Sequence, residues 1–181
     1  MAGIERMDFA ALDWISGTLS SPLLDRLMTA ATHLGDNGAV WALAAAALLL
    51  MKRTRRDGAR MLLSLFLCFL CGNLILKPLI ARPRPCWLRP EMPLLIPLPG
   101  DFSFPSGHTM TSFGAAGALF IGRRRAGAAA LVLAALIGFS RLYLFVHFPT
   151  DVAAGAVLGL AAAKISDQIL DLLWPSGRGP S

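Results

Sequence analysis

The sequence predicts an all-α protein, a polytopic membrane helix bundle. Hydrophobic residues make up 55% of its 181 residues and charged residues only 15%, whereas a soluble domain carries about 25% charged residues. Long apolar stretches recur along the chain, and short basic runs separate them. This composition excludes an ordinary soluble enzyme, a disordered protein and a disulfide-stabilised secreted module.

Five stretches are predicted as clear spans, since crossing a ~30 Å hydrocarbon core takes about 20 mostly apolar residues. They cover residues 37–51, 59–76, 105–122, 126–146 and 150–163, the last continuing as an amphipathic helix to Pro175. The last three stretches are rich in Ala and Gly, which allows close contact between helices in lipid.

The N-terminal part has apolar residues at helical spacing over 8–34, interrupted by charges, Gly17 and Pro22. We expect a helix lying at the membrane interface, followed by a short sixth membrane helix at 22–34. The chain is predicted to be one integral-membrane domain at 1–181, with N-terminal helices at 1–36, the main bundle at 37–174 and a cytoplasmic tail at 175–181.

Basic residues predict the orientation, because cytoplasmic loops are enriched in Lys and Arg. They cluster at 52–60 and 123–125, so both connections are expected in the cytoplasm. The connections at 77–104 and 147–150 then lie on the other side. The Ala- and Arg-rich composition looks bacterial, which predicts the inner cell membrane. The net charge of +6 does not indicate nucleic-acid binding, because no basic face interleaved with aromatic residues is visible.

Polar residues gather on the predicted extracytoplasmic side. Lys77 and Arg84 lie in the long connection, where an ammonium or a guanidinium fork suits phosphate. Ser106 and Gly107, followed by His108, open the third span, where free backbone N–H groups favour an anion.

A third cluster joins the fourth and fifth spans. Arg141 lies in an otherwise apolar span, and an ionisable residue there is a functional candidate. His147 and Asp151 are four residues apart with Pro149 between them, so a helix start must fold the carboxylate back onto the ring. A carboxylate on one ring nitrogen fixes the tautomer and leaves the other nitrogen nucleophilic.

Taken singly, each cluster has an ordinary structural explanation: a packed histidine, a snorkelling Lys or Arg, or a helix cap. A metal site is not expected, because His33, His108 and His147 lack the ligand spacing of a zinc site.

Together the clusters resemble the PAP2 (type 2 phosphatidic acid phosphatase) superfamily, whose pattern is K-x6-R-P, then P-S-G-H, then S-R-x5-H-x3-D. All three motifs occur in order, as Lys77 to Arg84-Pro85, Pro105 to His108, and Ser140-Arg141 to His147 and Asp151. The motifs lie within residues 73–155, and the helix pattern extends the resemblance to 34–174.

The resemblance implies a hydrolase, free of metal and cofactor, that acts on the phosphate or diphosphate end of a lipid. Its phosphate-binding residues would be Lys77, Arg84, Ser106, Gly107 and Arg141. His147 would attack phosphorus and form a phosphohistidine, and Asp151 would orient it. His108 would protonate the leaving oxygen and then activate water.

The membrane-edge placement favours a lipid substrate, and the compact chain with an outward site favours undecaprenyl diphosphate, converted to undecaprenyl phosphate. Phosphatidylglycerophosphate, phosphatidate and lipid A phosphate are alternatives. A non-catalytic lipid transporter or binding protein is a different class, which the two histidines and the carboxylate disfavour. The spans argue against a soluble vanadate-dependent haloperoxidase. The proline-rich loop at 90–100 either guides a lipid chain into the interface or forms a stiff lid. The sequence predicts no oligomeric state.

Overall fold

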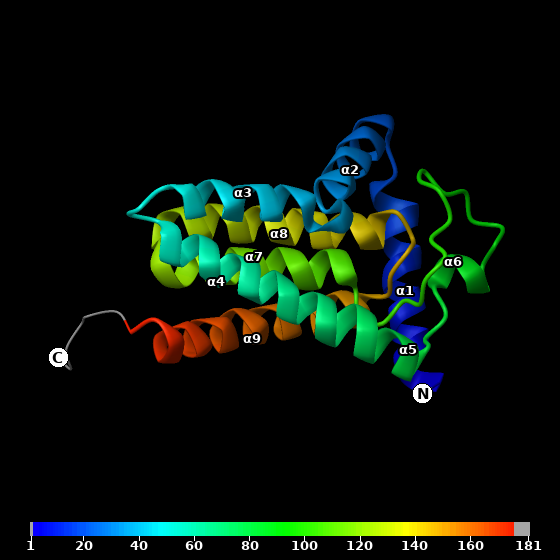
Figure 1. The fold of residues 1–181 in the computed structure, drawn as a ribbon. Coiled ribbons are helices and arrows are strands. Elements are labelled where there is room, and N and C mark those ends of the chain that lie inside the picture. Colours follow the sequence, from blue (N-terminus) through cyan, green and yellow to red (C-terminus); the bar gives the residue numbers. More distant parts are fainter. Residues whose placement is uncertain (1, 176–181) are drawn as a thin grey trace.

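A computed structural model describes residues 2–175, and within that range all regular elements are helices, as the sequence predicts. The long helices lie side by side and form a bundle (Figure 1). They are α3 (Ala39–Leu50), α4 (Arg55–Cys68), α7 (Gly107–Gly122), α8 (Arg124–Tyr143) and α9 (Pro149–Leu173).

The remaining elements gather at one end of the bundle. They are α1 (Ala2–Leu19), α2 (Pro22–Leu34), the short helix η1 (Asp36–Gly38), the π-helical segment η2 (Phe69–Leu76), α5 (Lys77–Ile80) and α6 (Pro85–Leu88). In Figure 1, α1 stands across this end. The short helix η1 joins α2 to α3, and η2 continues α4 into α5.

The central helix α7 packs against α4, α8 and α9. Its contact with α9 brings backbone close to backbone. A Cβ added to Gly159 would lie 2.3 Å from the carbonyl oxygen of Met110, and one added to Gly155 would lie 2.8 Å from that of Ser106. Small residues permit such close approach in lipid. The contact therefore fixes the distance between the first turn of α7 and the second and third turns of α9.

Ion pairs join the helices at the opposite end. Arg60 is 5% exposed, and it contacts Asp57 at 3.0 Å and Asp167 at 2.9 Å. Arg123 contacts Asp57 at 2.9 Å. The two basic connections, predicted to share one side, do meet at one end of the bundle.

The long connection at 77–104 covers the other end. Within it, Met92, Leu94 and Ile96 pack against the buried cluster of hydrophobic residues, whereas Leu95 and Leu98 are exposed. Part of the loop is therefore packed on the bundle, as a lid would be, and two leucines face outward, as a segment that enters the membrane interface would need. Both expected roles stay open.

Length and composition do not confirm the expected count of five clear spans. Within residues 2–175, two helices are long and apolar enough to cross a membrane, at Arg55–Leu88 and Arg124–Tyr143. The pair α2 and α3, bent by 43°, adds a third if it is one broken span. The helix α3 alone has 12 residues, which is about 18 Å at 1.5 Å per residue. A helix nevertheless occupies each expected stretch, including 22–34. The expected tail at 175–181 lies outside the described residues except for Pro175.

Candidate active site

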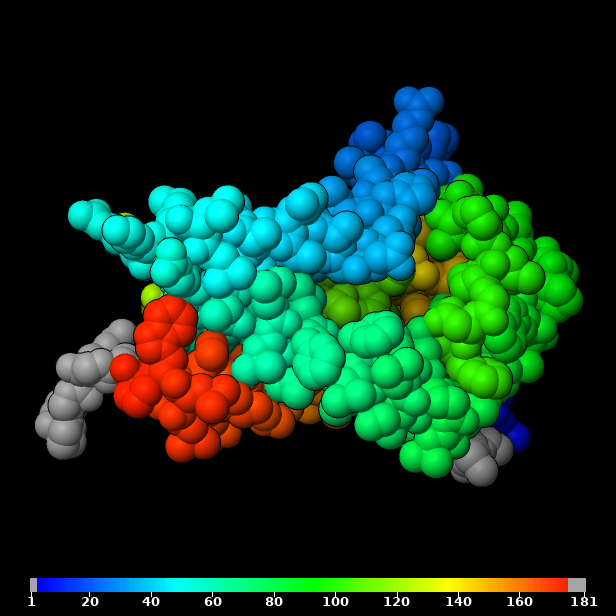
Figure 2. Space-filling view, in the orientation of Figure 1, coloured from blue at the N-terminus to red at the C-terminus, as the bar shows by residue number. Residues whose placement is uncertain are grey.

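A cavity of about 580 Å³ opens at the end of the bundle that the long connection covers. Six of the eight predicted site residues line it: Lys77, Arg84, Gly107, His108, Arg141 and His147. In Figure 2 a hollow lies between the blue α3, the green-cyan end of α4 and η2, and the green loop, with yellow and orange atoms at its floor.

An apolar wall continues the cavity away from its charged end. It is formed by Ala42 of α3, Leu62 and Leu65 of α4, and Phe69 of η2. A polar head and an apolar body of one ligand could therefore occupy the same space.

Three cations from separate segments converge on the cavity: Lys77, Arg84 and Arg141. Arg84 is fixed by a 2.7 Å hydrogen bond that its Nη1 donates to the carbonyl oxygen of Val146. Arg141 is 4% exposed and donates through Nη1 to the hydroxyl of Thr32. Its Nε has no partner within the part of the chain that the structure describes. A buried guanidinium nitrogen left free beside a cavity favours binding of an anion.

A carboxylate already stands between two of these cations. Asp101 contacts Lys77 and lies 2.6 Å from Nη2 of Arg84. Partial burial would raise the pKa of Asp101, but the hydrogen bond from Lys77 and the charge of Arg84 outweigh this effect and lower the pKa to about 2. Asp101 is therefore an anion of the protein itself at the predicted phosphate site, and the sequence analysis did not anticipate it.

His147 is buried, and its Nε2 lies 3.0 Å from Nη1 of Arg84. A guanidinium can only donate, so Nε2 carries a lone pair and the ring proton is on Nδ1. Nδ1 faces Ser103 Oγ at 3.4 Å and Asp151 Oδ2 at 3.7 Å. Burial and the charges of Arg84 and Arg141 lower the pKa of His147 well below its usual 6.5.

The carboxylate of Asp151 folds back toward His147, as expected from a helix start between them, but 3.7 Å is too long for a direct hydrogen bond. Its Oδ2 accepts instead from Ser103 Oγ at 2.5 Å and from the backbone N–H of Phe148 at 2.9 Å. Its Oδ1 accepts from Arg82 at 2.6 Å. Ser103 and Arg82 thus belong to the site.

Ser106 is fully buried and does not line the cavity. Its hydroxyl accepts from Thr109 at 2.9 Å, and its backbone N–H donates to the carbonyl oxygen of Asp151 at 3.2 Å. Gly107, the next residue, reaches the cavity wall. The structure therefore places Ser106 behind the wall, where it ties the start of α7 to α9.

The ring of His108 has a partner that the sequence did not reveal. Its Nε2 lies 2.9 Å from Oδ1 of Asp36, whose Oδ2 lies 2.8 Å from Nδ1 of His33. Asp36 reaches this position because η1 is a tight turn, in which Asn37 and Gly38 have φ values of 52° and 65°. The three groups form a chain from the exposed His33 to the cavity.

Residues 57–173 match the PAP2 superfamily, and this stretch contains all eight predicted site residues. The chain belongs to this superfamily. An undecaprenyl-diphosphatase of Sulfolobus acidocaldarius is 36% identical over 131 residues, which are 72% of this chain and 63% of that protein. This PAP2 chain thus spans less than two thirds of that relative.

Further PAP2-like proteins cover more of the chain. A decaprenylphosphoryl-5-phosphoribose phosphatase of Mycobacterium tuberculosis is 32% identical over 157 residues, 83% of this chain and 86% of that protein. The crystal structure of a transmembrane PAP2 type phosphatidylglycerolphosphate phosphatase from Bacillus subtilis is 30% identical, with a TM-score of 0.79. The match covers 98% of this chain and 90% of the Bacillus subtilis chain.

The residues that the sequence analysis missed fall into two groups. Arg82 lies inside the first PAP2 motif, between Lys77 and Arg84, whereas Asp101 and Ser103 lie between the first motif and the second. The charge or polarity of these residues in a membrane-edge loop was a usable signal. Asp36 lies before residue 57, outside the PAP2 match, and nothing in the sequence linked it to His108.

Proposed function

We propose that this PAP2 protein is an integral-membrane lipid phosphatase whose site faces the extracytoplasmic side of the inner membrane. The observation that carries the proposal is the convergence of Lys77, Arg84 and Arg141 on one cavity with the Nε2 lone pair of His147. The basic connections at the opposite end support the orientation, since such loops stay in the cytoplasm.

The reaction follows from these groups. Nε2 of His147 attacks phosphorus while the bond to the leaving oxygen breaks, and His108 gives that oxygen a proton. The positive charge that develops on the ring of His147 is stabilised by Asp151, with Ser103 between them. Water then attacks the phosphohistidine and passes its proton to His108, which releases inorganic phosphate and restores neutral His147. The three cations stabilise the phosphoryl oxygens in both steps.

We propose undecaprenyl diphosphate as the substrate. The apolar wall of the cavity supports a lipid with a long chain. Two relatives, from Sulfolobus acidocaldarius and Mycobacterium tuberculosis, carry names with polyprenyl substrates. Phosphatidylglycerophosphate is the second candidate, because the Bacillus subtilis structure of that activity covers 98% of this chain.

The deciding experiment measures phosphate release by the purified protein in detergent with EDTA. The lipids are undecaprenyl diphosphate, phosphatidylglycerophosphate, phosphatidate and lipid A, with His147→Ala as the control. Turnover that persists in EDTA and disappears in His147→Ala supports the proposal, and the preferred lipid identifies the substrate. Absence of turnover on every lipid contradicts it.

The low pKa of His147 predicts a neutral nucleophile over the whole range in which a free imidazole becomes charged. The folded-state pKa is lowered, so the ring stays unprotonated as the pH falls through 6.5 and gains a proton only at clearly lower pH. The chain has 3 histidines, so nitrogen NMR of histidine-labelled protein can follow each ring after assignment by substitution. A titration midpoint of His147 at 6.5 or above would contradict the prediction.

Removal of the Asp101 carboxylate should strengthen binding of phosphate. In Asp101→Asn the anion that pairs with Lys77 and Arg84 is gone, so added phosphate no longer competes with it. Because Asp101 is half exposed, each ion pair contributes up to about 1 kcal/mol, or about fivefold in affinity. The inhibition constant of inorganic phosphate should fall by about that factor. An unchanged or higher constant would show that Asp101 does not compete for the site.

A further inference from the structure

The N-terminal helix α1 carries a buried carboxylate that reaches the catalytic region. Asp8 is 3% exposed. Its Oδ2 accepts from Nη2 of Arg82 at 2.7 Å and from the hydroxyl of Thr150 at 2.6 Å, and its Oδ1 accepts from the backbone N–H of Thr150 at 3.1 Å. All hydrogen bonds described for this carboxylate are with Thr150, the residue before Asp151, and with Arg82, which also donates to Asp151.

Arg82 bridges two carboxylates. While Nη2 holds Asp8, Nη1 donates to Oδ1 of Asp151 at 2.6 Å and to the hydroxyl of Thr150 at 2.7 Å. The guanidinium also lies 4.0 Å above the ring of Phe148. The planar guanidinium group of an arginine can donate hydrogen bonds to two fixed carboxylates at once. One oxygen of Asp151 is thereby fixed, which leaves the other oxygen to face Ser103 and the ring of His147.

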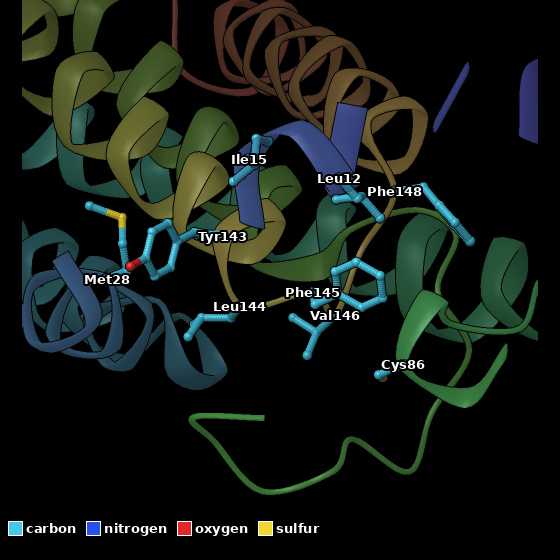
Figure 3. Close-up of a cluster of buried hydrophobic side chains, with 9 residues drawn as sticks. All are labelled: Leu12, Ile15, Met28, Cys86, Tyr143, Leu144, Phe145, Val146 and Phe148. Atoms are coloured by element: carbon cyan, nitrogen blue, oxygen red, sulfur yellow. The ribbon is translucent and has the colours of Figure 1, made fainter. Parts of the chain in front are cut away.

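Apolar packing from the same helix supports this chain of contacts. Phe9 of α1 meets Phe148 edge to face, with ring centroids 5.1 Å apart. Leu12 and Ile15 belong to one buried cluster with Val146 and Phe148, the two neighbours of His147 in the chain (Figure 3). The helix α1 therefore contacts the backbone segment that carries the nucleophile as well as the network around Asp151.

We propose that α1 completes the active site: Asp8, acting through Arg82, is a positioning residue for Asp151 and hence for His147. This inference rests on the phosphatase function proposed above. Asp8 lies outside the stretch that matches the PAP2 superfamily, which begins at residue 57. Neither Asp8 nor Asp151 lines the cavity, so loss of the contact should slow the chemical step and leave substrate binding intact.

The test compares Asp8→Asn with Asp13→Asn. The control residue lies on the same helix and pairs with Arg89 at 2.5 Å, but its side chain is 49% exposed. Among the described residues it makes no hydrogen bond to Arg82, Thr150 or Asp151. We expect Asp8→Asn to lower kcat by about 10- to 100-fold, as a small misplacement of catalytic groups does, with KM within about twofold. Both constants of Asp13→Asn should stay within about twofold of the wild type. Loss of kcat in both variants, or in neither, overturns the proposal.

A double-mutant cycle separates positioning from a purely structural role. If Asp8 acts through Arg82, the variant with both Asp8→Asn and Arg82→Gln should lose no more kcat than Arg82→Gln alone. If the kcat losses of the two single variants multiply in the double variant, the proposal is overturned. Single-turnover labelling should show slower formation of the phosphohistidine in Asp8→Asn. The labelled fraction is normalised to the amount of folded protein, measured as the monodisperse peak in size-exclusion chromatography.

Two further comparisons keep the outcome decisive. If Asp8→Asn does not fold, Arg82→Lys keeps the charge but cannot bridge both carboxylates, and it should show the same loss of kcat with unchanged KM. An unchanged kcat in that variant overturns the inference. A wild-type protein inactive on every lipid contradicts the proposed function instead, whereas an active wild type with a fully active Asp8→Asn contradicts only the role of α1.

Discussion

Substitution of His147 by Gln should abolish phosphate release and leave lipid binding nearly unchanged. The imidazole is buried, and its Nε2 lies 3.0 Å from Arg84. The other histidine that lines the cavity, His108, has its Nε2 against Asp36, so we expect it not to replace His147 as nucleophile. Loss of an activated nucleophile typically lowers kcat by about 10³-fold or more. The cations Lys77, Arg84 and Arg141 remain, so the charged end of the substrate keeps its partners.

The measurement for His147→Gln has two parts. Turnover is followed by phosphate release, and equilibrium binding is followed with a non-hydrolysable analogue of the lipid diphosphate. No labelled phosphoenzyme should form in the variant. Activity above about one hundredth of the wild type would mean that another residue attacks phosphorus, because a missing nucleophile leaves far less.

Substitution of Gly159 by Ala should destabilise the whole bundle. The new Cβ would lie 2.3 Å from the carbonyl oxygen of Met110 and 2.8 Å from the backbone nitrogen of Gly114, and backbone cannot move aside as a flexible side chain can. Forcing an extra carbon into a packed interface costs about 1–3 kcal/mol. Separation of α7 from α9 would also move Asp151 and His108 apart, so kcat should fall together with the free energy of unfolding.

The matched control is Gly17→Ala on α1, where a Cβ meets nothing within 4 Å. Alanine in a helix interior is more stable than glycine by about 0.5–1 kcal/mol, so this variant should be as stable as the wild type or more so. Unfolding in mixed micelles measures both. Equal stability of Gly159→Ala and the wild type would show that α7 and α9 can separate freely.

The sequence predicts those parts of the site whose residues lie only a few positions apart in the chain. His147 and Asp151 are four residues apart, and Ser106 to His108 open one helix, so local geometry alone brings these groups to one end of the bundle. Apolar stretches likewise predicted where helices lie. The number of membrane spans was harder to predict, because α3 has only 12 residues and lies next to a bend that a hydropathy pattern does not reveal.

The partners of the motif residues could not be predicted, because they are distant in the chain. His108 meets Asp36 from 72 positions away, and Thr150 meets Asp8 from 142 positions away. A lone aspartate on an amphipathic helix is most simply read as solvated. Only the packing of α1 and η1 onto the bundle shows that Asp8 is buried against Arg82 and that the half-exposed Asp36 faces His108.

The carboxylate of Asp101 is tethered to the cavity and competes with any entering phosphate for Lys77 and Arg84. A group fixed to the same chain competes at an effective concentration of about millimolar or above, so inorganic phosphate should bind about fivefold more weakly than it would without this carboxylate. After the proposed hydrolysis, phosphate would lie between Lys77 and Arg84, and the carboxylate of Asp101 is tethered beside these two cations. If the proposed phosphatase function holds, we therefore expect Asp101 to shorten the time for which the product phosphate stays bound.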